Sequence, residues 1–190
     1  MKIGLLYASF DPIHIGHLIV ANAVYETTVM DRIWFVVSPQ NPFKKNKILL
    51  QEIDRFDLVT LAIRDHSYFK ASDIEFNLPR PSYTIDTMIY LESLYLDYEF
   101  KLIMGEENLD QYRKWKNYQE ILSQYGIIIY PRKVSLEAPL INHENVILIS
   151  APRVDISASY IRKMLQEGKA PRYLVPEEVL KLIELKKYYS

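Results

Sequence analysis

Residues 3–17 read IGLLYASFDPIHIGH, an apolar run that leads into a turn with two histidines three positions apart. This pattern predicts a buried strand, a turn and the start of a helix. The turn would expose backbone N–H groups, and the helix start adds further donors and a partial positive charge. Imidazoles placed there can donate hydrogen bonds to oxygens that gain charge during phosphoryl or nucleotidyl transfer. We therefore predict that His14 and His17 are catalytic; the alternative is that His14 packs the turn and His17 caps the helix.

The rest of the chain alternates between strand-like and helix-like segments. Strands are predicted at residues 3–7, 33–37, 69–76, 100–104, 127–130 and 146–149. Helices are predicted at about 16–25, 50–64 and 85–95, then from Ser157 as N-cap to Gly168, and again from Pro176. In the helix at 50–64, one face would carry Ile53, Phe56, Val59 and Ile63.

Continuous apolar strands between helices are typical of a parallel sheet covered on both faces. We predict an α/β, Rossmann-like, doubly wound fold with a mainly parallel sheet, helices on both faces and a helical C-terminal segment. One domain is expected over residues 1–190, with 155–190 as its helical C-terminal part. Ligands of such folds lie beyond the carboxyl ends of the strands, which is where the histidine turn would be.

The amino-acid composition indicates which partners and which cellular compartment to expect. The chain has 190 residues, of which 49% are hydrophobic, and a net charge of −1 from 23 basic and 24 acidic side chains. This balance predicts no general surface for polyanions, so no nucleic acid is expected as a partner. No apolar run approaches the length needed to cross a bilayer, so no membrane is expected either. The absence of cysteine excludes disulfides and thiolate chemistry, and the first residues lack a signal-peptide pattern, so we expect a cytoplasmic protein.

Two further segments predict phosphate contacts. Lys44 follows the second strand, where one of two adjacent lysines could bind phosphate; the alternative is solvated surface charge. Hydroxyls and free N–H groups at the helix start near Ser159, with Arg162 one turn further, predict an anion site. The alternative there is a plain N-cap with a surface arginine.

A fourth segment follows the strand at 100–104. Gly105 would allow a base or sugar to approach closely, and Glu107 could accept hydrogen bonds from ribose hydroxyls. Trp115 has polar neighbours, which favours a stacking surface over a core position. In the histidine turn, Asp11 is expected to bind its own backbone, and Gly16 to mark a close backbone approach.

Several common sites are missing from the sequence. There is no HExxH motif, cysteine cluster or close carboxylate pair, so no protein-held metal is predicted. No GxSxG motif indicates a serine hydrolase, and neither GxGxxG nor a P-loop is present.

Together these segments resemble a known family. Ser9-Phe10-Asp11-Pro12 with His14-x-Gly16-His17, and residues 156–162, are similar to the two signatures of the HxGH nucleotidyltransferases. Within that superfamily, residues 81–87, Gly105 to Asn108 with Trp115, and residues 152–157 resemble bacterial nicotinate-nucleotide adenylyltransferases. The resemblance runs from residue 1 to about 176.

The resemblance implies an activity and a set of site residues. ATP and nicotinate mononucleotide would give deamido-NAD and pyrophosphate, with Mg²⁺ carried on ATP, and a homo-oligomer is possible. The catalytic residues would be His14, His17, Lys44 and Arg162. The residues along ATP would be Ser9, Phe10, Gly16, Gly105, Glu107, Ile156 and Ser159. The mononucleotide would contact Tyr83, Thr84, Trp115 and Arg132.

The sequence departs from the family pattern at a few positions. The family usually has glycines at the positions of Tyr7 and Ala8, aspartate at Glu107 and threonine at Ser159. We therefore expect a tighter or shifted turn here, a Glu107 side chain longer by one methylene, and the same hydroxyl at Ser159. No general base is evident, and none is required, because the attacking phosphate has a second pKa of about 6.

Other functions stay open. The acceptor could instead be nicotinamide mononucleotide or phosphopantetheine, or the protein could be a nucleotide-binding sensor without turnover. A class I tRNA-charging enzyme shares the tetrapeptide, but this chain is short for one and has no basic excess for RNA.

Overall fold

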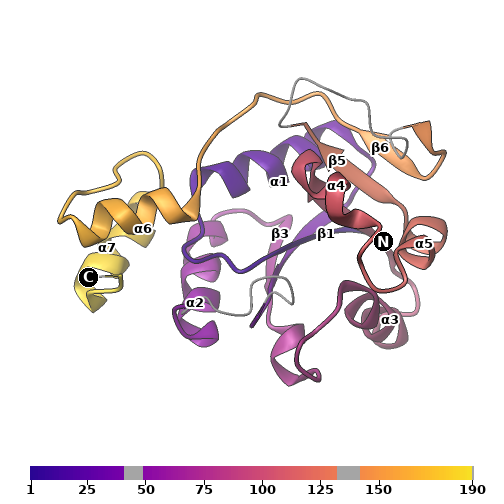
Figure 1. Ribbon diagram of the computed structural model, residues 1–190, viewed down its shortest axis with the longest axis horizontal. Coiled ribbons are helices and arrows are strands. Elements are labelled where there is room, and N and C mark those ends of the chain that lie inside the picture. Colours follow the sequence, from indigo (N-terminus) through magenta and orange to yellow (C-terminus); the bar gives the residue numbers. More distant parts are fainter. Residues whose placement is uncertain (41–48, 132–141, 190) are drawn as a thin grey trace.

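The computed structural model describes residues 1–40, 49–131 and 142–189. Within these residues a six-stranded parallel sheet has the order β3-β2-β1-β4-β5-β6 (Figure 1). The strands are β1 (Lys2–Ala8), β2 (Arg32–Val37), β3 (Phe69–Ser72), β4 (Glu99–Gly105), β5 (Ile127–Tyr130) and β6 (Val146–Leu148). This order confirms the predicted doubly wound, Rossmann-like class, because the chain winds outward from β1 in both directions.

Helices connect the strands and cover both faces of the sheet. The main helices are α1 (Ile15–Thr27), α2 (Glu52–Ile63), α3 (Thr84–Leu94), α6 (Ala158–Gln166) and α7 (Glu177–Lys186). Shorter turns are η1 (Ile74–Asn77), η2 (Glu106–Asn108), α4 (Leu109–Tyr112), α5 (Tyr118–Glu120) and the π-helical η3 (Ile121–Tyr125). In the described residues no helix has both the length and the apolar character needed to cross a membrane.

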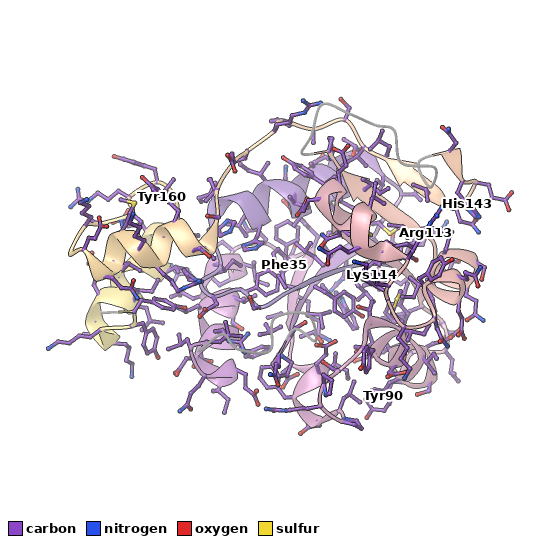
Figure 2. All side chains as sticks on the ribbon, in the orientation of Figure 1. Phe35, Tyr90, Arg113, Lys114, His143 and Tyr160 are labelled. Carbon is purple, nitrogen blue, oxygen red and sulfur yellow. The ribbon has the colours of Figure 1, made fainter. Side chains whose placement is uncertain are left out.

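Alternate residues of the central strands enter two separate cores. Leu6 and Phe35 pack with α1, α2 and α7 on one face, and Phe35 lies in the interior in Figure 2. Leu5 and Trp34 pack with α3, α4 and η3 on the other face. Burial on both faces explains why these strands read as unbroken apolar runs.

The last two helices pack beside the start of α1. Figure 1 shows α6 and α7 beyond the amino-terminal end of α1, on the side of the molecule away from β6. The backbone N–H of Ile15 donates to the carbonyl of Leu174 at 2.8 Å, which ties the two regions together. The single domain over 1–190 stays a prediction.

The structure corrects two details of the predicted elements. The strand predicted at 69–76 ends at Ser72, and the chain then turns into η1, which directs Glu75 into the interior. Ile53 is 63% exposed, although the predicted buried face of α2 included it. The buried position in that turn of the helix belongs to Arg55, which is 1% exposed.

Arg55 binds the backbone carbonyls that follow β1 and β2. Its Nη1 donates to the carbonyl oxygens of Ser9 and Ser38, the latter at 2.9 Å. Nη2 donates to Pro39 at 3.1 Å, and Nε to Leu50 at 2.8 Å. Carbonyls at strand ends have no ladder partner and are costly to bury alone, so one guanidinium satisfies several of them at once. Burial lowers the pKa of Arg55, and the nearby charge of Asp11 opposes that shift.

We expect Arg55→Met to destabilise the protein. Methionine keeps much of the volume but leaves the carbonyls of Ser9, Ser38 and Pro39 without their donor, so the free energy of unfolding should fall by about 3 kcal/mol. Arg64→Met, at the C-cap of the same helix and half-exposed, is the matched control. Equal urea midpoints for the two variants would contradict this role.

Candidate active site

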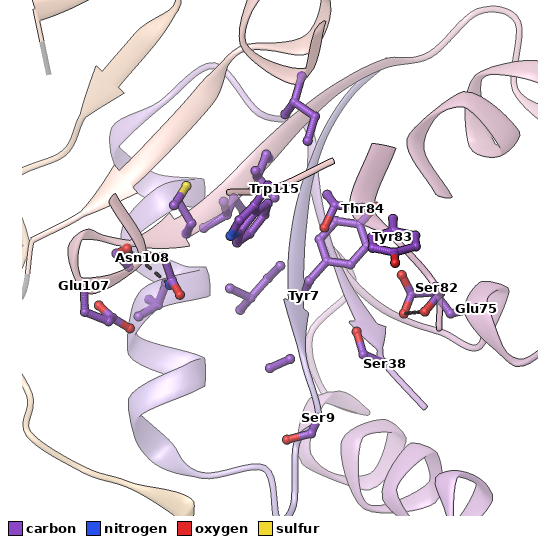
Figure 3. A pocket seen from close by; sticks show the side chains of 18 of the residues that line it. Tyr7, Ser9, Ser38, Glu75, Ser82, Tyr83, Thr84, Glu107, Asn108 and Trp115 are labelled. Carbon is purple, nitrogen blue, oxygen red and sulfur yellow. Dashed lines mark hydrogen bonds between the residues drawn. The ribbon is translucent and has the colours of Figure 1, made fainter. Parts of the chain in front are cut away.

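A cleft opens at the carboxyl ends of β1 and β4 (Figure 3). β1 has β2 on one side and β4 on the other, so the chain changes winding direction between β1 and β4. Open α/β sheets bind ligands at such a switch point. The predicted site residues that line this cleft are Ser9, His17, Tyr83, Thr84, Gly105, Glu107 and Trp115.

The histidine turn places its two rings against each other. The imidazoles of His14 and His17 stack with centroids 3.7 Å apart. The backbone N–H of His14 donates to Nδ1 of His17 at 3.2 Å. Because Nδ1 accepts, the proton of the neutral His17 ring is on Nε2, which is then a donor. His17 lines the cleft, whereas His14 is 3% exposed and does not line it.

Gly16 packs closely against His14 in this turn. A Cβ at Gly16 would lie 3.0 Å from Cε1 and Nδ1 of His14 and 3.7 Å from Cβ of Ile156. The close approach predicted for this glycine is therefore an approach to the His14 ring and to the segment before α6. Ile156 thus packs near the histidine turn, and its predicted contact with ATP stays a prediction.

Phe10 supports His17 from the core. Its side chain is 1% exposed, and its ring centroid is 4.9 Å from that of His17 and 5.7 Å from that of Phe35. The residue has φ of +46°, so the backbone turns sharply directly after β1. The ring is therefore part of the support of the turn and does not line the cleft.

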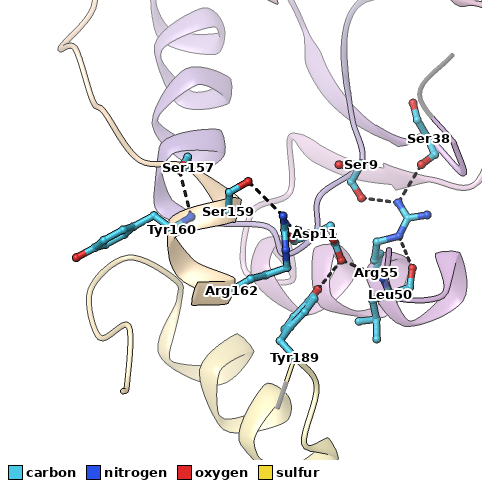
Figure 4. A network of polar contacts seen from close by, with 10 residues as sticks. All are labelled: Ser9, Asp11, Ser38, Leu50, Arg55, Ser157, Ser159, Tyr160, Arg162 and Tyr189. Carbon is cyan, nitrogen blue, oxygen red and sulfur yellow. Dashed lines mark hydrogen bonds and ion pairs between the residues drawn. The ribbon is translucent and has the colours of Figure 1, made fainter. Parts of the chain in front are cut away.

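Asp11 contacts distant segments, and the prediction that it binds its own backbone is wrong. Its Oδ1 accepts hydrogen bonds from the backbone N–H of Leu50 at 3.2 Å and from the hydroxyl of Tyr189 at 2.9 Å (Figure 4). Nη1 of Arg162 lies 3.3 Å from Oδ2 and also donates to the backbone carbonyl of Asp11. The carboxylate is buried at 1% exposure, so it needs these partners from elsewhere in the chain.

The start of α6 lies beside the histidine turn. Ser157 is the N-cap, as predicted, and its Oγ accepts the backbone N–H of Tyr160 at 3.2 Å. Nη2 of Arg162 donates to Oγ of Ser159 at 3.2 Å. Segments about 150 residues apart thus form one polar group, and Figure 4 shows Arg162 between Ser159 and Asp11.

Trp115 lies on one side of the cleft in Figure 3, with Tyr83 and Thr84 on the other. The indole is partly exposed and rests against Tyr112, with ring centroids 5.6 Å apart. The next residue, Lys116, pairs with Asp86 of α3 at 2.7 Å. This ion pair connects the tryptophan segment to the helix that carries Thr84.

The expected open space above Gly105 is filled. A Cβ at Gly105 would collide with the carboxylate of Glu107, which folds back over this glycine. A ligand approaching Gly105 would first have to displace the flexible end of the Glu107 side chain, so the room predicted above this glycine stays a prediction. Lys44 and Arg132 lie outside the described residues, and their predicted contacts stay predictions.

The sequence analysis missed a buried carboxylate in the cleft wall. Glu75 is 2% exposed, and it accepts hydrogen bonds from Oγ of Ser82 at 2.9 Å and from Oγ1 of Thr87 at 2.8 Å. Burial raises the pKa of Glu75, and the hydroxyls of Thr87, Ser82 and Ser38 oppose this in part. The signal for it was a lone acidic residue between Ile74 and Phe76, which the strand interpretation placed outside the core.

The sequence of this chain is similar to those of known proteins. The cytidylyltransferase-like family matches residues 5–164. A protein of Cytophaga hutchinsonii named "Probable nicotinate-nucleotide adenylyltransferase" is 55% identical over 190 residues, which cover 100% of this chain and 99% of that protein. A protein of the same name from Flavobacterium psychrophilum is 45% identical over 192 residues, with both chains covered in full. The chain belongs to the nicotinate-nucleotide adenylyltransferase family.

A solved structure of another protein has the same fold as this chain. It is Plasmodium falciparum nicotinic acid mononucleotide adenylyltransferase complexed with NaAD, with a TM-score of 0.82 and 20% identity. The superposition covers 99% of this chain and 97% of the other. The two proteins therefore share one fold along nearly their whole length.

We expect Glu75→Gln to change how stability depends on pH. A raised pKa in the folded state means that the native protein resists ionisation of Glu75. Its contribution to stability is therefore largest below the ordinary carboxyl pKa of about 4.3 and is lost as the pH rises through the folded value. The variant cannot ionise, so its free energy of unfolding should increase relative to the wild type between pH 4 and pH 7.

Urea unfolding at several pH values measures this difference. Glu144→Gln, at an exposed position, is the control. A difference between Glu75→Gln and wild type that stays constant with pH would contradict the buried, ionisable state of Glu75.

Proposed function

We propose that this enzyme transfers the adenylyl group of ATP to nicotinate mononucleotide, giving deamido-NAD and pyrophosphate. The observation that carries the proposal is the contact of Arg162 with the turn that holds His14 and His17. An imidazole that lines the cleft, with a guanidinium bonded to the same turn, suits a triphosphate, and the indole of Trp115 in the cleft suits a pyridine. The names of the relatives at 55% and 45% identity support the same acceptor.

The reaction needs alignment and neutralisation more than proton transfer. An oxygen of the mononucleotide phosphate forms a bond to the α-phosphorus of ATP, the bond to the bridging oxygen breaks, and pyrophosphate leaves. The attacking phosphate is largely dianionic at neutral pH, so no general base is required. In this proposal Nε2–H of His17, which lines the cleft, would donate to a phosphate oxygen, and the stacked ring of His14 would hold the His17 ring in position. Arg162 would neutralise charge on the leaving phosphates.

The remaining predicted residues are assigned by their position relative to the cleft. Ser9, Gly105 and Glu107 would lie along ATP, together with Ser159, Gly16, Ile156 and the backbone of Phe10. Trp115 would stack on the pyridine ring, and Tyr83 and Thr84 would contact the same ring from the opposite side. Lys44 and Arg132 complete the proposed set, with contacts to the triphosphate and to the mononucleotide respectively.

Mg²⁺ is proposed to reach the site on the phosphates of ATP. In the described part of the chain, no group of three or more His, Cys, Asp or Glu side chains is arranged to hold a metal ion. Mg²⁺ commonly keeps several waters and binds through substrate phosphates, which requires few protein ligands. The proposed partners are thus two small molecules, and we propose that the enzyme works in the cytoplasm.

The test of the acceptor is pyrophosphate release from ATP and Mg²⁺. We expect the highest kcat/KM with nicotinate mononucleotide, compared with nicotinamide mononucleotide and phosphopantetheine. A preference for either of the other two acceptors would overturn the substrate while leaving the adenylyl transfer in place. No release with any of the three would favour a nucleotide-binding sensor.

In the same assay, His17→Ala is expected to lower kcat by about 10²- to 10³-fold, with a smaller effect on the KM for ATP. The reason is that a donor aimed at oxygens gaining charge acts mainly in the transition state. His143→Ala is the control, because this exposed histidine does not line the cleft. Wild-type turnover in His17→Ala would count decisively against the role of the ring.

A further inference from the structure

Two adjacent tyrosines after α7 reach back to different parts of the molecule. The hydroxyl of Tyr188 donates to Oδ1 of Asp54, on α2, at 2.7 Å. The hydroxyl of Tyr189 donates to Oδ1 of Asp11, in the histidine turn, at 2.9 Å. Figure 4 shows Tyr189 below Asp11 and beside Arg162. The two bonds are similar in kind, but only the second one reaches the proposed phosphate site.

The two oxygens of Asp11 have different partners. Oδ1 accepts from Tyr189 and from the backbone N–H of Leu50. Oδ2 faces Nη1 of Arg162 at 3.3 Å, with charge pairing but no hydrogen bond of its own. The hydrogen bonds to Oδ1 therefore fix the orientation of the carboxylate. That orientation in turn determines how Oδ2 faces the guanidinium of Arg162.

This arrangement limits how strongly Asp11 holds Arg162. Carboxylates bind arginine most tightly through two parallel N–H···O bonds. Here Oδ1 is occupied by Tyr189 and Leu50, so a two-oxygen pair with Arg162 does not form. Arg162, whose side chain is 19% exposed, is anchored by the backbone carbonyl of Asp11 and by Ser159. Without the tyrosine hydroxyl, the carboxylate could rotate and take both oxygens to the guanidinium.

We propose that Tyr189 is a positioning residue for adenylyl transfer, which acts by holding Oδ1 of Asp11 so that Arg162 stays available to the triphosphate. This inference rests on the proposed function, because it requires Arg162 to bind the phosphates of ATP. Tyr189 itself does not line the cleft. Its effect passes through Asp11 to Arg162.

The environment of Tyr189 keeps its hydroxyl a donor. Burial and the charge of Asp11 raise the pKa of Tyr189, and Arg162 and Arg55 oppose that shift more weakly. The phenol therefore remains protonated at neutral pH. The hydrogen bond to Asp11 persists across the pH range in which kinetics would be measured.

The test compares Tyr189→Phe with Tyr188→Phe in the full chain. Both variants keep the ring and lose one hydroxyl bonded to an aspartate, so similar small shifts in Tm are expected. Tyr189→Phe should raise the KM for ATP about three- to tenfold, the range that one hydrogen bond corresponds to, and leave the KM for nicotinate mononucleotide unchanged. Tyr188→Phe should leave both KM values at the wild-type level. Equal KM values for ATP in the two variants would overturn the proposal.

Arg162→Ala and the double variant separate this proposal from the proposed function. If Arg162→Ala leaves the KM for ATP unchanged, the phosphate role of Arg162 fails and the inference fails with it. If Arg162→Ala raises that KM while Tyr189→Phe does not, only the inference fails. In the Arg162→Ala background, Tyr189→Phe should add nothing further, because it acts through the missing side chain. Additive effects of the two substitutions would overturn the proposed route.

Discussion

The contact between Asp11 and Arg162 is the interaction on which the site depends. A carboxylate at 1% exposure must be compensated, and the compensation comes from segments far apart in sequence: the loop before α2, helix α6 and the residues after α7. Satisfying one buried charge therefore brings together the amino-terminal turn and the helical C-terminal part. The proposed phosphate site follows from this convergence, because it leaves Arg162 beside the histidine turn.

The sheet supplies the other half of the constraint. Because the chain changes direction at β1, the space above β1 and β4 is not filled by a crossover helix, and a cleft remains there. Arg55 satisfies the carbonyls where β1 and β2 end, which fixes the position from which the turn departs. Phe10 and the close packing of Gly16 on His14 then determine where the His17 ring points. The chemistry of the site thus follows from ordinary core packing.

Much of this could be predicted from the sequence because it is local. Unbroken apolar strands such as 33–37 and 127–130, the Ser157 cap and the histidine turn each have a signal within a few residues. The position of the cleft, at the carboxyl ends of β1 and β4, could be predicted from the fold class alone. What failed was long-range pairing: Asp11 was expected to bind its neighbours, and Ile53 was assigned to the buried face that Arg55 occupies. A charged residue buried among distant carbonyls carries no local pattern that distinguishes it from a surface arginine.

The residues that could not be predicted from the sequence also have partners from distant segments. Glu75 is buried because Ser82 and Thr87 meet it from the start of α3, and Tyr189 gains its partner only when α7 packs near α2. Similarly, the space above Gly105 could not be judged without knowing the rotamer of Glu107. In each case the sequence carries the residue type, and the tertiary structure decides its partner.

The central claim is that the histidine turn and α6 bind one triphosphate between them. A crystal structure with a non-hydrolysable ATP analogue and Mg²⁺ tests this most directly. We expect phosphate oxygens of a single analogue within hydrogen-bond distance of both Nε2 of His17 and the guanidinium of Arg162. An analogue bound with its phosphates on one of these groups only, and the other directed elsewhere, would contradict the account.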